Sequence, residues 1–273
     1  MTTPAGRIGA PDRLAGKTAL VTGAAGAIGT AVVHRLSAAG VNLLVCGRDR
    51  DRLEHLANQT GALPFVADLT DAGACRSAVA AAEHRFGRLD LVHLGVGTRG
   101  DCRDIAEFEL SAYRRVVAAN VDSVVFSLEA SVPALRRAGG GAITVSSSLA
   151  GVTGYGQFPL YSMTKAAVNG LVRATSQRLA RSNIYLAALC PSFVDKPLLG
   201  DFRSHLEQKG IPLLAPAEVA DALVQRLCAP PGDEPIWTLQ PGHPPVPHPC
   251  PAISPPAPIH GRPLGGRSGA DRR

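Results

Sequence analysis

The sequence is short of aromatic residues, of lysine and of long apolar runs, and each shortage argues against a class of protein. Phe, Trp and Tyr make up 4% of the 273 residues, and the net charge of +6 comes almost entirely from scattered arginines. Without a basic cluster or interleaved aromatic residues, this charge does not indicate a nucleic-acid partner. No apolar stretch approaches the roughly 18 residues of a membrane-spanning helix. The first residues also lack the apolar core of a secretion signal, so we predict a soluble, cytoplasmic protein with no membrane partner.

The cysteines lack the paired Cys-x-x-Cys spacing of metal or redox sites, and several stand inside apolar runs. This usage is typical of reduced, buried thiols in an intracellular protein. We therefore predict no metal site. The six positions are Cys46, Cys75, Cys102, Cys190, Cys228 and Cys250.

Short apolar runs alternate with segments of helical spacing along most of the chain. Such alternation predicts an α/β fold, with a central parallel sheet and helices on both faces. We expect a single doubly wound, Rossmann-type domain over residues 15–245, after a flexible arm at 1–14. The Pro-, Gly- and Arg-rich tail at 246–273 is predicted to be extended or disordered. Strands are predicted near 18–22, 41–46, 63–69, 89–97, 142–148, 183–191 and 235–240, and helices near 30–40, 48–59, 74–87, 104–138, 159–181 and 216–229.

The first predicted strand ends in a glycine-rich turn that opens a helix. In a strand–turn–helix unit, Gly23 would allow the tight turn, Gly26 the approach of the backbone to a diphosphate, and Gly29 close helix packing. The flanking strand and helix make this motif a candidate dinucleotide site.

A tyrosine and a lysine stand four residues apart on the helix predicted over 159–181. Tyr161 and Lys165 would share one face, so the ammonium could approach the phenol. A nearby cation favours the phenolate, and we expect Lys165 to lower the pKa of Tyr161 for acid/base work. Ser148 could polarise a carbonyl held beside the phenol.

With these motifs in this order, the chain resembles the short-chain dehydrogenase/reductase family from about residue 15 to 240. The resemblance rests on the turn from Thr22 to Gly29, on Asp68, on Asn120, on Ser148 and on the segment from Tyr161 to Lys165. It implies a homodimer or homotetramer that acts on a small-molecule substrate. The catalytic residues that it implies are Asn120, Ser148, Tyr161 and Lys165. The cofactor-binding residues that it implies are Thr22, Gly23, Gly26, Ile28, Gly29, Arg48, Asp68, Leu69, Gly95, Tyr161, Lys165, Pro191 and Val194.

The end of the second predicted strand indicates which nucleotide is preferred. Relatives that use NAD place an acidic residue there, which would repel a 2′-phosphate. This chain has Gly47-Arg48 instead, and a guanidinium suits a phosphate. We therefore predict NADP(H), with NAD as the alternative because Asp49 follows directly.

Four departures from the family pattern keep other functions open. Leu94 to Gly97 replace the usual Asn-Asn-Ala-Gly, Ala27 replaces a turn glycine, Ser192 replaces a glycine, and Lys196 stands where a threonine is common. The first hypothesis is an NADP(H)-dependent secondary alcohol–ketone oxidoreductase, such as a ketoreductase of secondary metabolism. The second is a non-redox epimerase, dehydratase or cyclase that uses the same Tyr and Lys. The third is a nucleotide-binding protein with little catalysis.

By the same resemblance, a lid at about 193–214 closes a mainly apolar pocket. The substrate is then a moderately hydrophobic molecule. Polar anchors are expected at Gln157, Lys196 and Arg203, while His93 is interpreted as a buried core residue.

Overall fold

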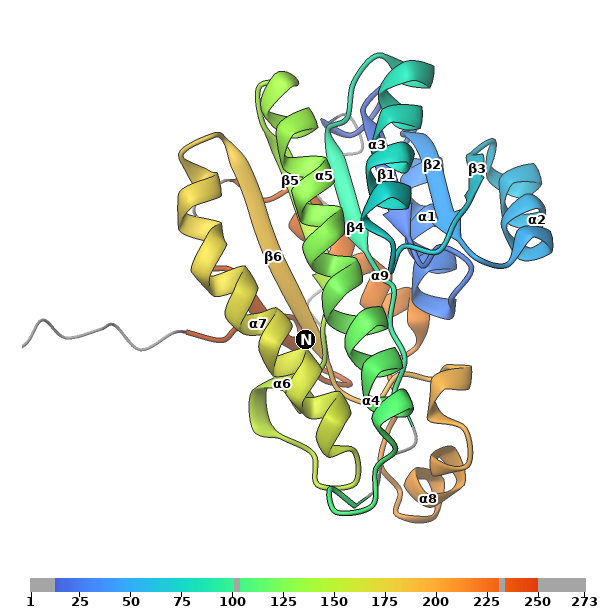
Figure 1. Cartoon of the computed structure of the whole chain (residues 1–273), viewed down its shortest axis with the longest axis vertical. Coiled ribbons are helices and arrows are strands. Elements are labelled where there is room, and N and C mark those ends of the chain that lie inside the picture. Colours follow the sequence, from blue (N-terminus) through green and yellow to red (C-terminus); the bar gives the residue numbers. More distant parts are fainter. Residues whose placement is uncertain (1–12, 101–103, 231–233, 250–273) are drawn as a thin grey trace, which may run out of the picture.

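The computed structural model describes residues 13–100, 104–230 and 234–249, which fold around one eight-stranded sheet (Figure 1). The strands stand in the order β3-β2-β1-β4-β5-β6-β7-β8. All neighbours pair in parallel except β8, which runs antiparallel to β7. The predicted Rossmann-type α/β fold is confirmed. The strands are β1 Thr18–Thr22, β2 Asn42–Gly47, β3 Leu63–Val66, β4 Leu91–Leu94, β5 Gly141–Ser146, β6 Ile184–Pro191, β7 Ile236–Leu239 and β8 Val246–Pro247.

Helices cover both faces of this sheet. Figure 1 shows α3, α5 and α7 across one face, while α1 and α9 pack together on the other. The helices are α1 Ala27–Ala38, α2 Arg50–Thr60, α3 Ala72–Phe86, α4 Leu110–Val117, α5 Ser123–Arg137, α6 Ala150–Thr153, α7 Pro159–Ala180, α8 Phe202–Gln208 and α9 Pro216–Leu227. A π-helical turn, Ala118–Asp122, joins α4 to α5, and a 3-10 turn spans Pro197–Leu199.

Successive residues of the central strands serve two separate cores, because side chains alternate across a strand. Leu20 and Leu44 pack with the helices of one face. Val21 and Val45 pack with the helices of the other. All four are fully buried, which explains why these strands read as continuous apolar runs rather than as alternating patterns.

The strand order reverses between β1 and β4, and this reversal positions the site. The chain leaves β1 toward β2 on one side and returns to β4 on the other. In doubly wound sheets, ligands bind in the crevice that this arrangement opens beyond the carboxyl ends of the strands. The glycine turn after β1 and the loop after β4 both lie at this edge.

Two predicted boundaries differ from the structure. β8 places Val246 and Pro247 in the sheet, so the domain end predicted at 245 is two residues short. Leu14, assigned to the arm, is buried in the core with α1 and α9. A two-residue strand that ends in a proline has no periodicity to detect. The rest of the arm (1–12) and of the tail (250–273) lies outside the described residues.

The helix predicted over 104–138 begins later and is interrupted. α4 starts at Leu110, and the π-helical turn around Asn120 separates it from α5. Among the described helices, the stretch Leu110–Arg137 is long and apolar enough to cross a membrane by length and composition, which is weak evidence. Its buried side chains pack against α3 and the sheet.

The predicted lid at 193–214 is a loop whose two ends are joined. Val194 and Leu214 form a β-bridge. The N–H of Asp195 donates to the carbonyl of Leu214 (2.9 Å), and the N–H of Leu214 donates to the carbonyl of Phe193 (2.8 Å). The 3-10 turn and α8 therefore rise from a single point beyond β6.

A buried carboxylate ties the amino end of β1 to β4. Asp90, 3% exposed, accepts a hydrogen bond from the backbone N–H of Thr18 (3.0 Å) and from Nε of Arg88 (2.9 Å). We expect Asp90→Ala to lower the free energy of unfolding by about 1.5–3 kcal/mol, since the Thr18 N–H loses a charged acceptor. Urea unfolding followed by circular dichroism measures this.

Glu54→Ala provides the control for Asp90→Ala. Glu54 pairs with Arg50 on the exposed side of α2, where an ion pair contributes about 0.5 kcal/mol or less. Equal effects of the two substitutions would contradict the structural role of Asp90.

Candidate active site

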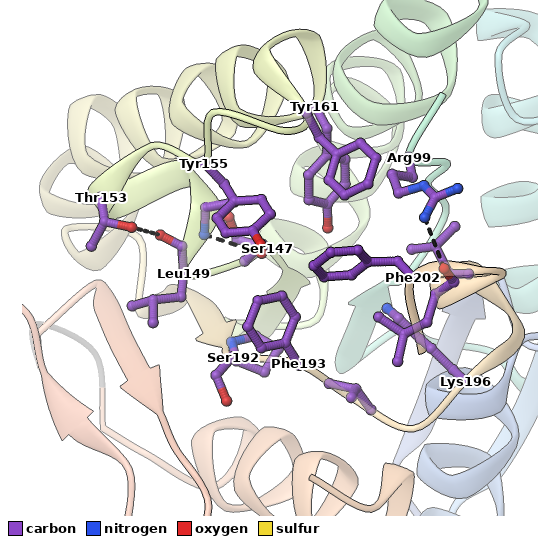
Figure 2. A pocket seen from close by; sticks show the side chains of 17 residues that line it. Arg99, Ser147, Leu149, Thr153, Tyr155, Tyr161, Ser192, Phe193, Lys196 and Phe202 are labelled. Atoms are coloured by element: carbon purple, nitrogen blue, oxygen red, sulfur yellow. Dashed lines mark hydrogen bonds between the residues drawn. The ribbon is translucent and has the colours of Figure 1, made fainter. Parts of the chain in front are cut away.

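Two cavities meet beside Tyr161. The first lies at the glycine turn, and its wall includes Gly23, Gly26, Ile28, Gly29, Gly95 and Lys165. The second lies under the lid and is mainly apolar (Figure 2). Four residues belong to both walls, namely Ser147, Tyr161, Lys196 and Leu198. A ligand in one cavity can therefore touch a ligand in the other at the phenol.

The glycine turn leaves no room for side chains. Gly23 has φ +64°, and a Cβ there would stand 2.6 Å from the carbonyl carbon of Gly95. A Cβ on Gly29 would overlap the carbonyl oxygen of Gly23. The tight turn and the close helix packing predicted for these two residues are therefore present, and α1 begins at the cavity wall.

Six of the predicted cofactor-binding residues lie outside the wall of the glycine-lined cavity. Thr22 is buried and accepts a hydrogen bond from the N–H of Gly95 (3.0 Å), so it braces the turn from beneath. Asp68 is turned toward Thr70, whose N–H and hydroxyl it accepts at 3.0 and 2.9 Å. The other four are Leu69, which is buried in the core, Pro191 and Val194, which line the apolar cavity, and Arg48, which is exposed after β2.

Arg52, which the sequence analysis missed, lines the glycine-lined cavity. The available signal was its spacing, since a residue four after Arg48 returns to the same edge of the sheet once α2 begins. Asp49, the acidic residue beside Arg48, caps that helix by accepting from the N–H of Arg52 (3.1 Å).

The phenol of Tyr161 and the hydroxyl of Ser148 meet at the junction of the cavities. Burial raises the pKa of Tyr161 to about 12, although the hydrogen bond with Ser148 acts in the opposite direction. The protein groups around Tyr161 thus hold it as a neutral phenol. The expectation that Lys165 lowers this pKa is wrong for these groups, because burial has the larger effect.

Lys165 lies beneath the ring of Tyr161 rather than beside its hydroxyl. Its Nζ stands 5.7 Å from the ring centroid and donates to the carbonyl of Ser146 (2.8 Å). Burial lowers the pKa of Lys165 to about 7, and the charge of Lys196 lowers it further. The lysine therefore titrates near neutral pH.

Asn120 uses its side chain to join three segments. Its Oδ1 accepts from the N–H of Thr98 (2.7 Å), while Nδ2 donates to the carbonyl of Thr98 (2.8 Å) and to Oγ1 of Thr164 (2.9 Å). Thr164 in turn donates to the carbonyl of Tyr161 (2.8 Å). The π-helical turn is thereby fixed to the loop after β4 and to α7.

The apolar cavity has an aromatic wall made by Tyr155, Phe158, Phe193 and Phe202, whose rings contact one another (Figure 2). Of the predicted polar anchors, Lys196 lines this cavity. Gln157 is exposed and outside the wall, and Arg203 pairs instead with Asp195 and Glu207.

Arg99 is a further lining residue that the sequence analysis missed. It follows β4, and the signal was the meeting of parallel strand ends at one edge of the sheet. The interpretation of His93 as a core residue is confirmed, since burial lowers its pKa to about 4 and Nδ1 lies 3.0 Å from Oγ1 of Thr144.

Comparison with known proteins identifies this arrangement. A family model for short chain dehydrogenases matches residues 17–207. The chain belongs to the short-chain dehydrogenase family. This is an oxidoreductase family, and the predicted resemblance is confirmed.

Two curated relatives of this short-chain dehydrogenase carry names of cyclic alcohol dehydrogenases. The cyclohexanol dehydrogenase of Acinetobacter sp. (strain SE19) is 30% identical over 191 residues, which cover 68% of this chain and 76% of the relative. The trans-4-hydroxycyclohexanecarboxylate dehydrogenase of Sinomonas cyclohexanicum is 31% identical over 223 residues, covering 77% and 84%. Among solved structures, the 3-ketoacyl-(acyl-carrier-protein) reductase of Brucella melitensis, complexed with NADH, is 26% identical with a TM-score of 0.77, covering 83% and 97%.

The hydrogen bonds of Asn120 predict how this dehydrogenase responds to Asn120→Ala. The buried Thr98 N–H and carbonyl would lose their partners, at a cost of about 1–3 kcal/mol of unfolding free energy. We expect faster amide exchange at Thr98 as well. Asn120→Asp keeps the Oδ1 acceptor and should preserve the protection of Thr98, as measured by hydrogen–deuterium exchange. Unchanged exchange in the alanine variant would contradict this clamp.

Proposed function

We propose that the protein is an NADP(H)-dependent oxidoreductase that interconverts a secondary alcohol and a ketone on a moderately hydrophobic small molecule. The observation that carries this proposal is the position of Tyr161. The phenol lies where a glycine-lined cavity at the start of α1 meets an apolar cavity under the lid, with Ser148 as its hydrogen-bond partner. A cofactor and a substrate would thus meet beside a proton donor.

The glycine-lined cavity suits a dinucleotide. Its wall brings the backbone of Gly23, Gly26 and Gly29 to the amino end of α1, where a diphosphate is favoured. The charged side chains in the described wall are Arg52, Lys165 and Lys196, all basic. When bound, the nicotinamide cofactor supplies or accepts the hydride. By resemblance to the family, Lys165 would also hold its ribose.

Tyr161 and Ser148 would handle the proton. In the reducing direction, the phenol donates its proton to the carbonyl oxygen while the Ser148 hydroxyl donates a hydrogen bond to the same atom. The phenolate that remains is favoured by the cation of Lys165 beneath the ring. Asn120 would act as a positioning residue, through its bonds to Thr98 and Thr164.

The substrate is proposed to be an alicyclic alcohol or ketone. The aromatic wall of the apolar cavity supports a ring-shaped ligand, and two relatives are named for six-membered cyclic alcohols. We also propose a cytoplasmic homodimer or homotetramer. Exposed apolar side chains at Leu110, Val125 and Met163 support association of this kind, and the four described cysteines are free, as in a reducing compartment.

Tyr161→Phe tests the proposed chemistry. With NADPH and cyclohexanone derivatives, followed at 340 nm, we expect the turnover number to fall about 10²–10⁴-fold, because the proton donor is gone. Nucleotide affinity, measured by fluorescence titration, should stay within a few-fold. Tyr155→Phe is the matched control, since it removes another phenol from the same wall and should leave turnover nearly unchanged. Product formation without any change at 340 nm would instead indicate a non-redox enzyme.

The preference for NADP(H) is proposed on two arginines. Arg48 stands exposed after β2, Arg52 lines the glycine-lined cavity, and the neighbouring carboxylate of Asp49 is engaged in capping α2. A 2′-phosphate would meet two guanidinium groups at this edge.

Removing these arginines should weaken NADP(H) and spare NAD(H). We expect Arg48→Ala and Arg52→Ala each to raise the dissociation constant of NADPH by about tenfold or more, the loss of one charge-assisted contact. The dissociation constant of NADH should change little. Arg50→Ala, which removes an exposed arginine paired with Glu54, is the control. An unchanged nucleotide preference in Arg48→Ala and Arg52→Ala would overturn this assignment.

A further inference from the structure

The apolar cavity carries positive charge that no carboxylate in its described wall balances. Its charged lining residues are Arg99 and Lys196, and the remaining polar groups are hydroxyls and backbone atoms. One of these hydroxyls, Oγ of Ser192, is buried and has no hydrogen-bond partner in the described part of the chain. The wall thus offers donors without acceptors.

Lys196 is the less compensated of the two cations. In residues 13–100, 104–230 and 234–249, no hydrogen bond or ion pair engages its ammonium. The adjacent carboxylate of Asp195 is bound by Arg203, which also pairs with Glu207. Figure 2 shows the Lys196 side chain reaching into the cavity. Burial lowers its pKa to about 8, so the charged form is costly until an anion lies beside it.

Arg99 is held in place at the same cavity. Its Nη1 donates to the carbonyl of Leu199 (2.8 Å), and the guanidinium carbon lies 4.5 Å from the ring centroid of Phe158. The hydrogens on Nε and Nη2 have no partner among the described residues. A planar donor that is fixed and still has free N–H groups is suited to an anion.

We propose that Lys196 determines specificity by binding a carboxylate on the substrate, with Arg99 as the second cation. This inference rests on the proposed function and narrows it to a hydroxy or oxo acid. Because Lys196 and Tyr161 line both cavities, the carboxylate lies near the reacting carbon. The aromatic wall of Tyr155, Phe158 and Phe202 then holds the apolar body of the acid.

Binding of a non-reacting pair of probes tests this without turnover. Cyclohexanecarboxylate and cyclohexanecarboxamide have nearly the same shape and differ in charge. In isothermal titration calorimetry with NADPH present, we expect the wild-type protein to bind the carboxylate at least about tenfold more tightly, as for one charge-assisted contact. Lys196→Met should reduce this ratio below about threefold, and Lys196→Arg should keep most of it.

Lys209→Met is the matched control, because Lys209 is an exposed lysine of the same lid and its loss should leave the ratio unchanged. Lys196→Gln replaces the methionine variant if that variant does not fold. A wild-type ratio near one would overturn the inference. So would a Lys196→Met variant that binds NADPH more weakly but keeps the ratio, because Lys196 would then serve the cofactor. A normal carboxylate ratio without reduction of any oxo acid would contradict the proposed function and leave this inference standing.

Discussion

The site depends on one amide side chain that lies outside both cavity walls. Asn120 binds both backbone groups of Thr98 and the hydroxyl of Thr164, so it joins the helix pair α4–α5, the loop after β4 and α7. These three segments come from distant parts of the chain. Thr164 passes the constraint on by donating to the carbonyl of Tyr161. The π-helical turn is what aims the amide, since an extra residue in the turn changes which side chain faces inward.

Burial governs the electrostatics around this clamp. It raises the pKa of Tyr161 and lowers those of Lys165 and Lys196, so all three groups are held toward their neutral forms. In such surroundings a charge that arrives with a ligand is felt strongly, because little water screens it. The effect of the lysine on the tyrosine is thus conditional on what else is charged nearby. A spacing of four residues on a helix contains no information about this balance.

The fold was predictable because its strands are buried on both faces and separated by amphipathic helices. The glycine turn was predictable because Gly23 and Gly29 each meet backbone atoms where a Cβ does not fit. What the sequence did not reveal depends on contacts between distant segments. Asp68 satisfies a local turn instead of facing the cavity, and Arg52 and Arg99 reach the site through the ends of α2 and β4. The pairing of β8 with β7 is likewise a tertiary event of two residues.

The joined ends of the lid separate two properties of the chain. Residues 195–213 leave and re-enter the fold at one point, where Val194 meets Leu214. A change of length inside this loop therefore does not alter the distance that β6 and α9 must span. Loop length itself costs little free energy, since closure entropy grows slowly with the number of residues. The shape of the ligand cavity can thus be rewritten as a self-contained insert, while the sheet and the Asn120 clamp keep their register.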